Sequence, residues 1–201
     1  MKYYAIRQIE GVVYKEILTS WEECKPVVTG KMCEYKSFAK ESDAIAYLES
    51  YVEEPKEEEI LNNKDNYIYY VDGSYKGDMI GWGFVLIKDN TKLTQMCGGL
   101  EPNEDTSRNI TGELEATKMA VRHALANDFK NITIIYDYQG IGSYVNGSWK
   151  PKTNESKAYL NWMNKTIEEN SLNVSFVKVK GHSDNKWNDE VDTMAKKGCT
   201  L

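Results

Sequence analysis

The stretch Tyr67-Ile68-Tyr69-Tyr70-Val71-Asp72-Gly73-Ser74-Tyr75 decides the fold, because it places a carboxylate, Asp72, within a strongly β-forming run. Its aromatic and β-branched residues favour a pleated strand, and the lack of alternation with polar residues before Asp72 indicates that both faces are covered. We therefore expect a central strand. A carboxylate there is costly to bury unless it is paired or bound to a cation. The alternative is that Asp72 opens a turn with Gly73, since Asp-Gly is a common turn dipeptide.

Two further strands are predicted over residues 81–87 and 91–98, and the short connection between them indicates an antiparallel meander. The hydrophobic period then becomes helical over residues 111–127. Glu113 shares a face of this helix with Ala116, Thr117, Ala120 and Ala124. Small residues let the helix lie close to the sheet, which would bring Glu113 inward. The alternative is a solvent-facing glutamate that the helix dipole favours.

A compact apolar strand over residues 132–136 ends at Asp137, just before a helix that begins near Gly140. The carboxyl end of a buried parallel strand is where open α/β sheets place their ligands. The alternative is that Asp137 only caps the helix. The pattern further predicts an amphipathic helix over residues 156–170, a strand over residues 174–180, and a polar loop that runs into a closing helix from residue 181 onward.

Residues 1–49 are predicted to form a small α/β domain. The pattern indicates a strand over residues 3–6, a loop that contains Gly11, a helix that starts at Trp21, a segment over residues 35–38, and a second helix N-capped by Ser42. So small a domain has little core, and Trp21 and Phe38 can also be read as its anchors. Residues 50–66 carry Pro55 and dense charge, which predicts a linker to a second domain over residues 67–201.

The composition is typical of a soluble globular protein, because 41% of the 201 residues are hydrophobic and 28% are charged. No apolar run approaches the ~18 residues of a membrane span and the N-terminus lacks the apolar core of a signal peptide, so we expect a cytoplasmic protein. The cysteines form no Cys-x-x-Cys pair, which argues against zinc: Cys24, Cys33, Cys97 and Cys199. The net charge of -6 does not by itself favour a nucleic-acid partner, but acids that hold divalent cations would make the ligand-facing surface positive in effect.

Four acids and one histidine stand in motifs on successive elements. Asp72 lies in Val-Asp-Gly-Ser, Glu113 in Gly-Glu-Leu-Glu-Ala, Asp137 in Tyr-Asp-Tyr-Gln-Gly, and His182 in Lys-Gly-His, ten residues before Asp192. In their order and spacing over residues 67–198 they resemble the catalytic domain of type 1 ribonucleases H. The resemblance implies a ribonuclease H-like α/β fold: a five-stranded mixed sheet, its first three strands antiparallel, flanked by helices and preceded by the small α/β domain.

The chemistry of these residue types agrees with the resemblance. Neighbouring acids repel one another and raise each other's pKa values unless cations bind, and oxygen ligands without cysteine favour Mg²⁺ or Mn²⁺ over zinc. The resemblance implies two Mg²⁺ ions, with Mn²⁺ as a substitute, in which Asp72 bridges both ions, Glu113 and Asp137 bind on one side and Asp192 on the other. His182 would assist proton transfer or product release. The alternative is a surface loop histidine without such a role.

A second resemblance covers most of residues 3–49. The segments Tyr-Ala-Ile-Arg, Trp-Glu-Glu-Cys, Tyr-Lys-Ser-Phe and Ala-Tyr-Leu occur there in this order. They resemble the small N-terminal hybrid-binding domain of many type 1 ribonucleases H and of viroplasmin-like proteins. The resemblance implies that Trp21, Tyr35 and Lys36 grip duplex backbone, the rings on sugar and the lysine on phosphate. In this sequence the loop between Arg7 and Trp21 is longer than the family's, and Ser37 stands where a second lysine is common.

Substrate contacts are expected beside the acids. Recognition of a hybrid requires one strand with 2′-hydroxyls and one without, and the candidates that would read the sugar edge are Gly73, Ser74, Asn109 and Gln139. Ile110 stands where the family often has a second Asn. In the segment where some family members carry a basic extension, this chain has a short run that either meets a duplex backbone or forms a plain turn: Trp149, Lys150 and Lys152.

The residues and the resemblance together predict a metal-dependent endonuclease that acts as a monomer and hydrolyses the RNA strand of RNA/DNA hybrids. The resemblance implies that it leaves 5′-phosphate and 3′-hydroxyl ends. One alternative is an integrase-like nuclease of the same fold, against which the spacing of His182 and Asp192 and the hybrid-binding domain argue. The other is a non-catalytic protein that binds RNA/DNA or duplex RNA, against which the presence of all four acids argues.

Overall fold

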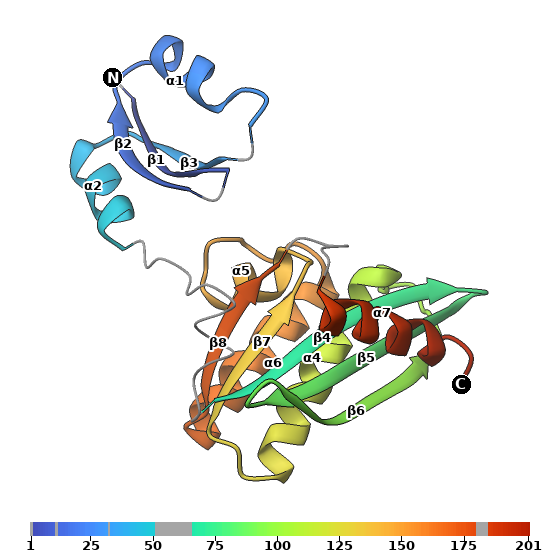
Figure 1. The fold of residues 1–201 in the computed structure, drawn as a ribbon. Coiled ribbons are helices and arrows are strands. Elements are labelled where there is room, and N and C mark those ends of the chain that lie inside the picture. The colour runs from blue at the N-terminus through green and yellow to red at the C-terminus, as the bar shows by residue number, and fades with distance from the viewer. Residues whose placement is uncertain (1, 11, 32, 51–65, 180–184) are drawn as a thin grey trace. The chain divides into compact units, whose positions relative to one another are not determined.

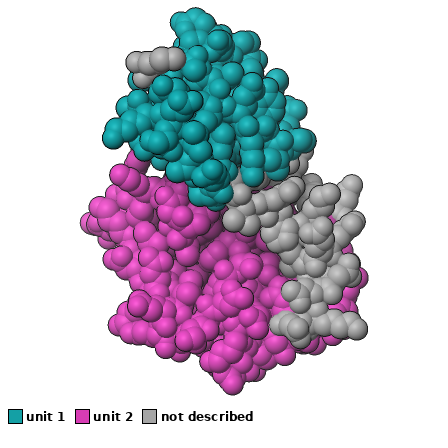
Figure 2. Space-filling model, turned by 90° about the vertical axis from the view of Figure 1, so that its left-hand side faces the viewer, with its two compact units in different colours: residues 1–54 teal, residues 55–201 magenta. Residues whose placement is uncertain are grey.

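The computed structural model describes residues 2–10, 12–31, 33–50, 66–179 and 185–201. The chain comprises two compact units, residues 1–54 and residues 55–201, which Figure 2 shows in teal and magenta. The predicted linker over residues 50–66 lies almost entirely outside the described residues. No helix in the described ranges is long and apolar enough to cross a membrane.

The smaller unit is a three-stranded antiparallel sheet with two helices (Figure 1). Its sheet has the order β2-β1-β3. In chain order its elements are β1 (Tyr3–Ile9), β2 (Val12–Leu18), α1 (Trp21–Val28), β3 (Cys33–Phe38) and α2 (Glu41–Glu49). Strand β2 occupies the region that the sequence predicted as a loop, and that prediction was wrong. Most of β2 is exposed, so its sequence lacks the alternation by which a half-buried strand is recognised.

A side-chain cap sets the start of one of the two helices in this unit. Ser20 caps α1 through a capping box, because its side chain accepts from the Glu23 N–H and the Glu23 carboxylate accepts from the Ser20 N–H. The predicted Ser42 cap of α2 is wrong, since the helix begins at Glu41 after Lys40, and Lys40 makes no capping hydrogen bond through its side chain. Instead, Arg7 of β1 holds the other end of α2 by donating to the Tyr47 carbonyl oxygen.

The two helices of the smaller unit contact residues on opposite faces of its sheet. Ile6 packs with Cys24 and Val28 of α1. On the other face, Glu34 and Phe38 of β3 both contact Tyr47 of α2, the first through the tyrosine hydroxyl and the second through ring packing at 5.2 Å. Side chains alternate along a strand, so successive residues of β3 point in turn to the α1 side and to the α2 side of the sheet.

The larger unit is built around a five-stranded mixed sheet with the order β6-β5-β4-β7-β8. Its elements are β4 (Tyr67–Lys76), β5 (Met79–Lys88), β6 (Thr91–Leu100), α4 (Asn109–Ala126), β7 (Asn131–Tyr136), α5 (Gly140–Val145), α6 (Asn154–Asn170), β8 (Asn173–Lys178) and α7 (Lys186–Gly198). Strands β4, β5 and β6 form the predicted antiparallel meander, and β7 and β8 run parallel to β4. The predicted fold class, element order and central position of the opening stretch are confirmed.

Two tight turns hold the meander in register. Gly77 and Asp78 connect β4 to β5, and Asp89 and Asn90 connect β5 to β6, all four with positive φ. Two-residue hairpin loops of this kind match the right-handed twist of the strands, and Gly, Asn and Asp adopt positive φ most readily.

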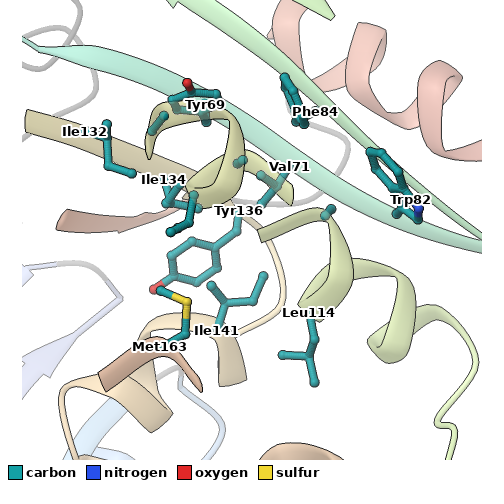
Figure 3. Packing of buried hydrophobic residues seen from close by; sticks show 14 of the residues in the cluster. Tyr69, Val71, Trp82, Phe84, Leu114, Ile132, Ile134, Tyr136, Ile141 and Met163 are labelled. Atoms are coloured by element: carbon teal, nitrogen blue, oxygen red, sulfur yellow. The ribbon is translucent and has the colours of Figure 1, made fainter. Parts of the chain in front are cut away.

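Hydrophobic packing covers both faces of the sheet, as the apolar run in β4 predicted. Tyr69 and Val71 pack with residues of α4 and α6 on one face, in the cluster that Figure 3 shows, whereas Ile68 and Tyr70 pack with α7 on the other. Fully burying one such side chain contributes roughly 1.5–3 kcal/mol. Asp72 follows two residues after Tyr70, so the strand's alternation directs it to the α7 side.

Glycine in β5 lets α7 approach the sheet. A Cβ built at Gly81 would overlap the Ala195 carbonyl oxygen and approach the Cys199 amide nitrogen to 2.7 Å. Any side chain at this position would therefore displace the helix that carries Asp192.

We predict that Gly81→Ala destabilises the larger unit. Overpacking costs about 1–3 kcal/mol in a dense core, which corresponds to a fall of roughly 5 °C in the thermal midpoint. Gly77→Asn is the matched control, because a Cβ there meets nothing within 4 Å and asparagine tolerates the φ of +60°. Circular dichroism melts compare the two variants, and equal midpoints would contradict the packing argument.

Candidate metal centre

Asp72 lies where the parallel part of the sheet ends. The pairing of β4 with β7 stops at Tyr70 and Ile135, while β4 continues to Lys76. Asp137 directly follows β7, so its side chain emerges beside Asp72. The Gly73 amide donates to Asp72 Oδ1 at 2.7 Å, which orients the carboxylate.

Glu113 reaches the same point from α4. A Cβ at Gly73 would overlap the Asn109 carbonyl oxygen and the Glu113 amide, so the absence of a side chain lets the first turns of α4 lie against β4. Glu113 is only 7% exposed and shares its buried face with the four small residues named above: Ala116, Thr117, Ala120 and Ala124. The inward orientation predicted for Glu113 is thus observed.

Three carboxylates meet at this point. Ligand oxygens of Asp72, Glu113 and Asp137 all lie within 4.8 Å of one another, and we call this set the acidic triad. Within the described residues it is the one cluster of three or more acidic, histidine or cysteine side chains with this spacing. Glu113 Oε2 is buried and has no hydrogen-bond partner there. A buried oxygen without a donor is unfavourable, and a cation is one way to satisfy it.

Burial and mutual repulsion raise the pKa values of two members of the triad. Burial raises the pKa of Asp72 to about 7, with further contributions from the negative charges of Asp137 and Asp192, against the Gly73 N–H and the Lys196 charge. Burial, then Asp137 and Asp72, raise the pKa of Glu113 to about 9. Without a cation, the raised pKa values favour a protonated Glu113 and a partly protonated Asp72 at neutral pH. Its oxygen-only donor set fits a hard divalent cation.

Asp192 stands apart from the triad. It lies on α7 and its Oδ2 pairs with Lys196 Nζ at 2.5 Å, one helical turn further on. The negative charge of Asp192 still raises the pKa of Asp72. Asp192 therefore influences the triad, although its carboxylate is not among the oxygens that lie within 4.8 Å of one another. Lys196 was not among the sequence-predicted site residues. The signal that could have found it is the i, i+4 spacing of opposite charges on a predicted helix.

The predicted loop histidine, His182, lies outside the described residues. The chain is described again from Asn185, which caps α7 by accepting from the Trp187 and Asn188 amides. The Asn185 side chain also lies 3.5 Å from the Tyr70 hydroxyl of β4.

The candidate substrate contacts lie on several elements around the triad. Gly73 packs against the first turn of α4, and Asn109 is the first residue of that helix. Ser74 is the next residue of β4 and pairs with Gly81 of β5. Gln139 donates to Ser143 Oγ at 2.9 Å, which places its amide on the start of α5. Ile110 is partly buried against the core.

The predicted basic run lies between α5 and α6. The Trp149 ring is 45% exposed and stands edge-on to Tyr144, with ring centroids 6.2 Å apart. Lys150 and Lys152 are exposed as well. Such an exposed aromatic ring beside two lysines is suited to contact a nucleic-acid backbone.

In the smaller unit the three predicted contact residues are divided between two faces. Trp21 and Tyr35 stack, with ring centroids 6.3 Å apart and an interplanar angle of 26°. Lys36 lies on the opposite face of β3, since its neighbours in alternation, Glu34 and Phe38, both contact α2. Its Nζ lies 5.7 Å from the centre of the Phe38 ring.

Two family models match the chain, one in each unit. The family model for RNase H matches residues 64–200, well over half of the chain, and the model for the ribonuclease H1 N-terminal domain matches residues 2–48. The ribonuclease H of Francisella philomiragia is 32% identical over 149 residues, which cover 69% of this chain and 93% of that protein. The ribonuclease H of Chlorobaculum parvum is 27% identical over 134 residues, or 63% of this chain and 90% of that protein.

Solved structures share the fold of the larger unit. Ribonuclease H1 from the archaeon Halobacterium salinarum aligns with a TM-score of 0.56 at 18% identity, covering 66% of this chain and 96% of that one. LC11-RNase H1, solved in complex with an RNA/DNA hybrid, aligns with a TM-score of 0.57 at 18% identity, covering 67% of this chain and 96% of that one.

The raised pKa of Asp72 predicts how stability depends on pH in metal-free protein. A carboxyl whose pKa rises on folding contributes stability that is present at low pH and is lost as the pH rises from its unfolded-state value, ~4, to its folded value of about 7. Asp72→Asn stays neutral, so it should raise the thermal midpoint in chelator at pH 8 by on the order of 5 °C, and by less at pH 5.

Asp89→Asn is the control for this measurement, because Asp89 is an exposed acid in the turn between β5 and β6 and is not part of the triad. Calorimetry in EDTA follows the transition of the larger unit at both pH values. A midpoint at pH 8 that is unchanged or lower in Asp72→Asn would show that Asp72 carries no such penalty.

Proposed function

Because the chain belongs to the ribonuclease H family, we propose that its larger unit cleaves the RNA strand of RNA/DNA hybrids at the acidic triad, with 5′-phosphate and 3′-hydroxyl products. The close grouping of three carboxylates from β4, α4 and the end of β7 carries this proposal. LC11-RNase H1, which has the same fold, was solved with an RNA/DNA hybrid, and this supports the same substrate class here.

The donor set assigns the residues that would hold divalent metal. Asp72, Glu113 and Asp137 would hold a first cation, and Asp72 together with Asp192 would hold a second one. We propose Mg²⁺ as the physiological cation, with Mn²⁺ as a substitute, because both are oxygen-seeking and form octahedral sites. When bound, such cations lower the pKa of an attacking water and stabilise the charge on the leaving oxygen.

The protein's own groups position the substrate and the ligands. The Gly73 amide fixes the Asp72 carboxylate, and the close contact of α4 with β4 fixes Glu113. We assign the backbone at Gly73 and Ser74, together with Asn109 and Gln139, to contacts with the sugar edges near the triad, where the two strands of a hybrid differ by the 2′-hydroxyl. His182 keeps its proposed part in proton transfer or product release.

The smaller unit is proposed to bind duplex without reading its sequence. Its match to the ribonuclease H1 N-terminal domain supports this, and the stacked pair of Trp21 and Tyr35 offers exposed rings to sugars. We assign residues 1–49 to this domain, residues 67–201 to the catalytic domain and residues 50–66 to the linker. A short linker raises the effective concentration of the catalytic domain at a bound duplex.

We also propose that the protein acts as a monomer in the cytoplasm. The four cysteines are free in the structure, which fits a reducing compartment.

We predict that labelled RNA/DNA hybrid is cut in Mg²⁺, whereas RNA/RNA and DNA/DNA duplexes are not. Asp137→Asn should lower cleavage of the hybrid by about 100-fold or more, since residues that only support metal ligands already cost 10- to 100-fold. Folding and hybrid binding should persist, as shown by circular dichroism and filter binding.

Two results of this assay would contradict the proposal. Full activity of Asp137→Asn would remove the triad from catalysis, and hybrid binding without any cleavage in Mg²⁺ or Mn²⁺ would favour the non-catalytic alternative. Asp128→Asn serves as the control, since Asp128 is an exposed acid in the turn after α4.

We predict that Trp21→Ala weakens hybrid binding about 5- to 100-fold, because aromatic stacking on nucleic acid contributes about 1–3 kcal/mol per ring. The maximal cleavage rate at saturating hybrid should change little. Tyr14→Ala is the matched control, as Tyr14 is another exposed aromatic side chain of the same unit, 43% exposed on β2. Fluorescence anisotropy with labelled hybrid measures both variants, and equal affinities would locate the binding surface elsewhere.

A further inference from the structure

Among the described residues, Asp192 is the one member of the predicted set of four acids that forms an ion pair with a lysine. Asp192 and Lys196 lie one turn apart on α7, with Oδ2 and Nζ separated by 2.5 Å. The acidic residue precedes the basic one, which is the favourable order for such a pair on a helix. The pair occupies a carboxylate oxygen that a cation would otherwise bind.

Lys196 also acts on the triad itself. Its positive charge lowers the pKa of Asp72, against the stronger effects of burial and of Asp137. Lys196 therefore interacts with Asp192 by direct contact and with Asp72 through its charge. A positive charge in this place stabilises the acids when no metal is present and repels a divalent cation that approaches them.

We propose that Lys196 is a built-in counter-cation that keeps Asp192 out of the acidic triad and must release it before a divalent cation can use Asp192 as a ligand. This inference rests on the proposed function of the triad as a metal centre. Lys196 is a positioning residue in this scheme, because it acts through Asp192 and not on the reacting atoms.

The exposure of the pair makes this exchange feasible. The Lys196 side chain is 59% exposed and that of Asp192 31% exposed. Exposed ion pairs between neighbouring turns of a helix are weak, and a lysine on its flexible stem can turn into solvent without disturbing the helix. A divalent cation beside the three other carboxylates can therefore displace the ammonium group, and Asp192 becomes available only when the cation is there.

The test is a double-mutant cycle on metal affinity without substrate. Calorimetric titration with Mn²⁺ is performed on the full chain and on Lys196→Met, Asp192→Asn and the double variant. Lys196→Met should bind Mn²⁺ about tenfold more tightly than the unaltered chain, within the usual range for coupling between neighbouring sites. In the Asp192→Asn background the same substitution should improve affinity only about two- to threefold, because only the repulsion between the Lys196 charge and the cation then remains.

Lys197→Met is the matched control, since it removes the same charge from the next residue of α7, which has no carboxylate partner among the ion pairs of the described residues. An equal gain in Lys197→Met, an equal gain with and without Asp192, or no gain in Lys196→Met would each overturn the inference. Failure of the unaltered chain to bind Mn²⁺ would instead contradict the metal centre on which the inference rests.

Discussion

Repulsion among buried carboxylates is the constraint on which the larger unit depends. Asp72, Glu113 and Asp137 lie close together in a place where charge is poorly solvated, and the raised pKa values of Asp72 and Glu113 record the cost. A fold that served stability alone would not gather three acids at the end of a hydrophobic sheet. The arrangement becomes favourable when a bound cation neutralises the negative charge of the carboxylates. The same repulsion therefore destabilises the metal-free site and favours metal binding.

The sheet and its glycines make this arrangement rigid. β4 is paired on both sides up to Tyr70 and is packed on both faces, which fixes the position of Asp72 at the point where β7 ends. Because Gly73 has no side chain, α4 lies close against β4, and this contact fixes the position of Glu113. Because Gly81 has no side chain, α7 lies close against β5, and this contact fixes the position of Asp192. Ligands on strands and helices hold their geometry better than ligands on loops, which suits a site that must orient a phosphodiester.

The two units differ in where a lysine lies relative to the proposed functional surface. The smaller unit has a stacked aromatic pair on one face of its sheet, while Lys36 lies on the other face. The larger unit has a basic group, Lys196, at the edge of its acidic triad. The proposed duplex-binding surface and the proposed metal centre thus differ in the charged groups beside them.

The sequence by itself determined the order of elements, the central strand and the three acids of the triad, because hydrophobic period and motif spacing are local properties of the chain. It did not predict β2, an exposed strand without alternation, or the start of α2 at Glu41, where no side-chain cap marks the helix. Only the tertiary structure showed that Asp192 lies apart from the triad and that the two helices of the smaller unit contact opposite faces of β3. Those features depend on how α7 sits on the sheet and how β3 pairs with β1, and contacts between segments distant in sequence decide both.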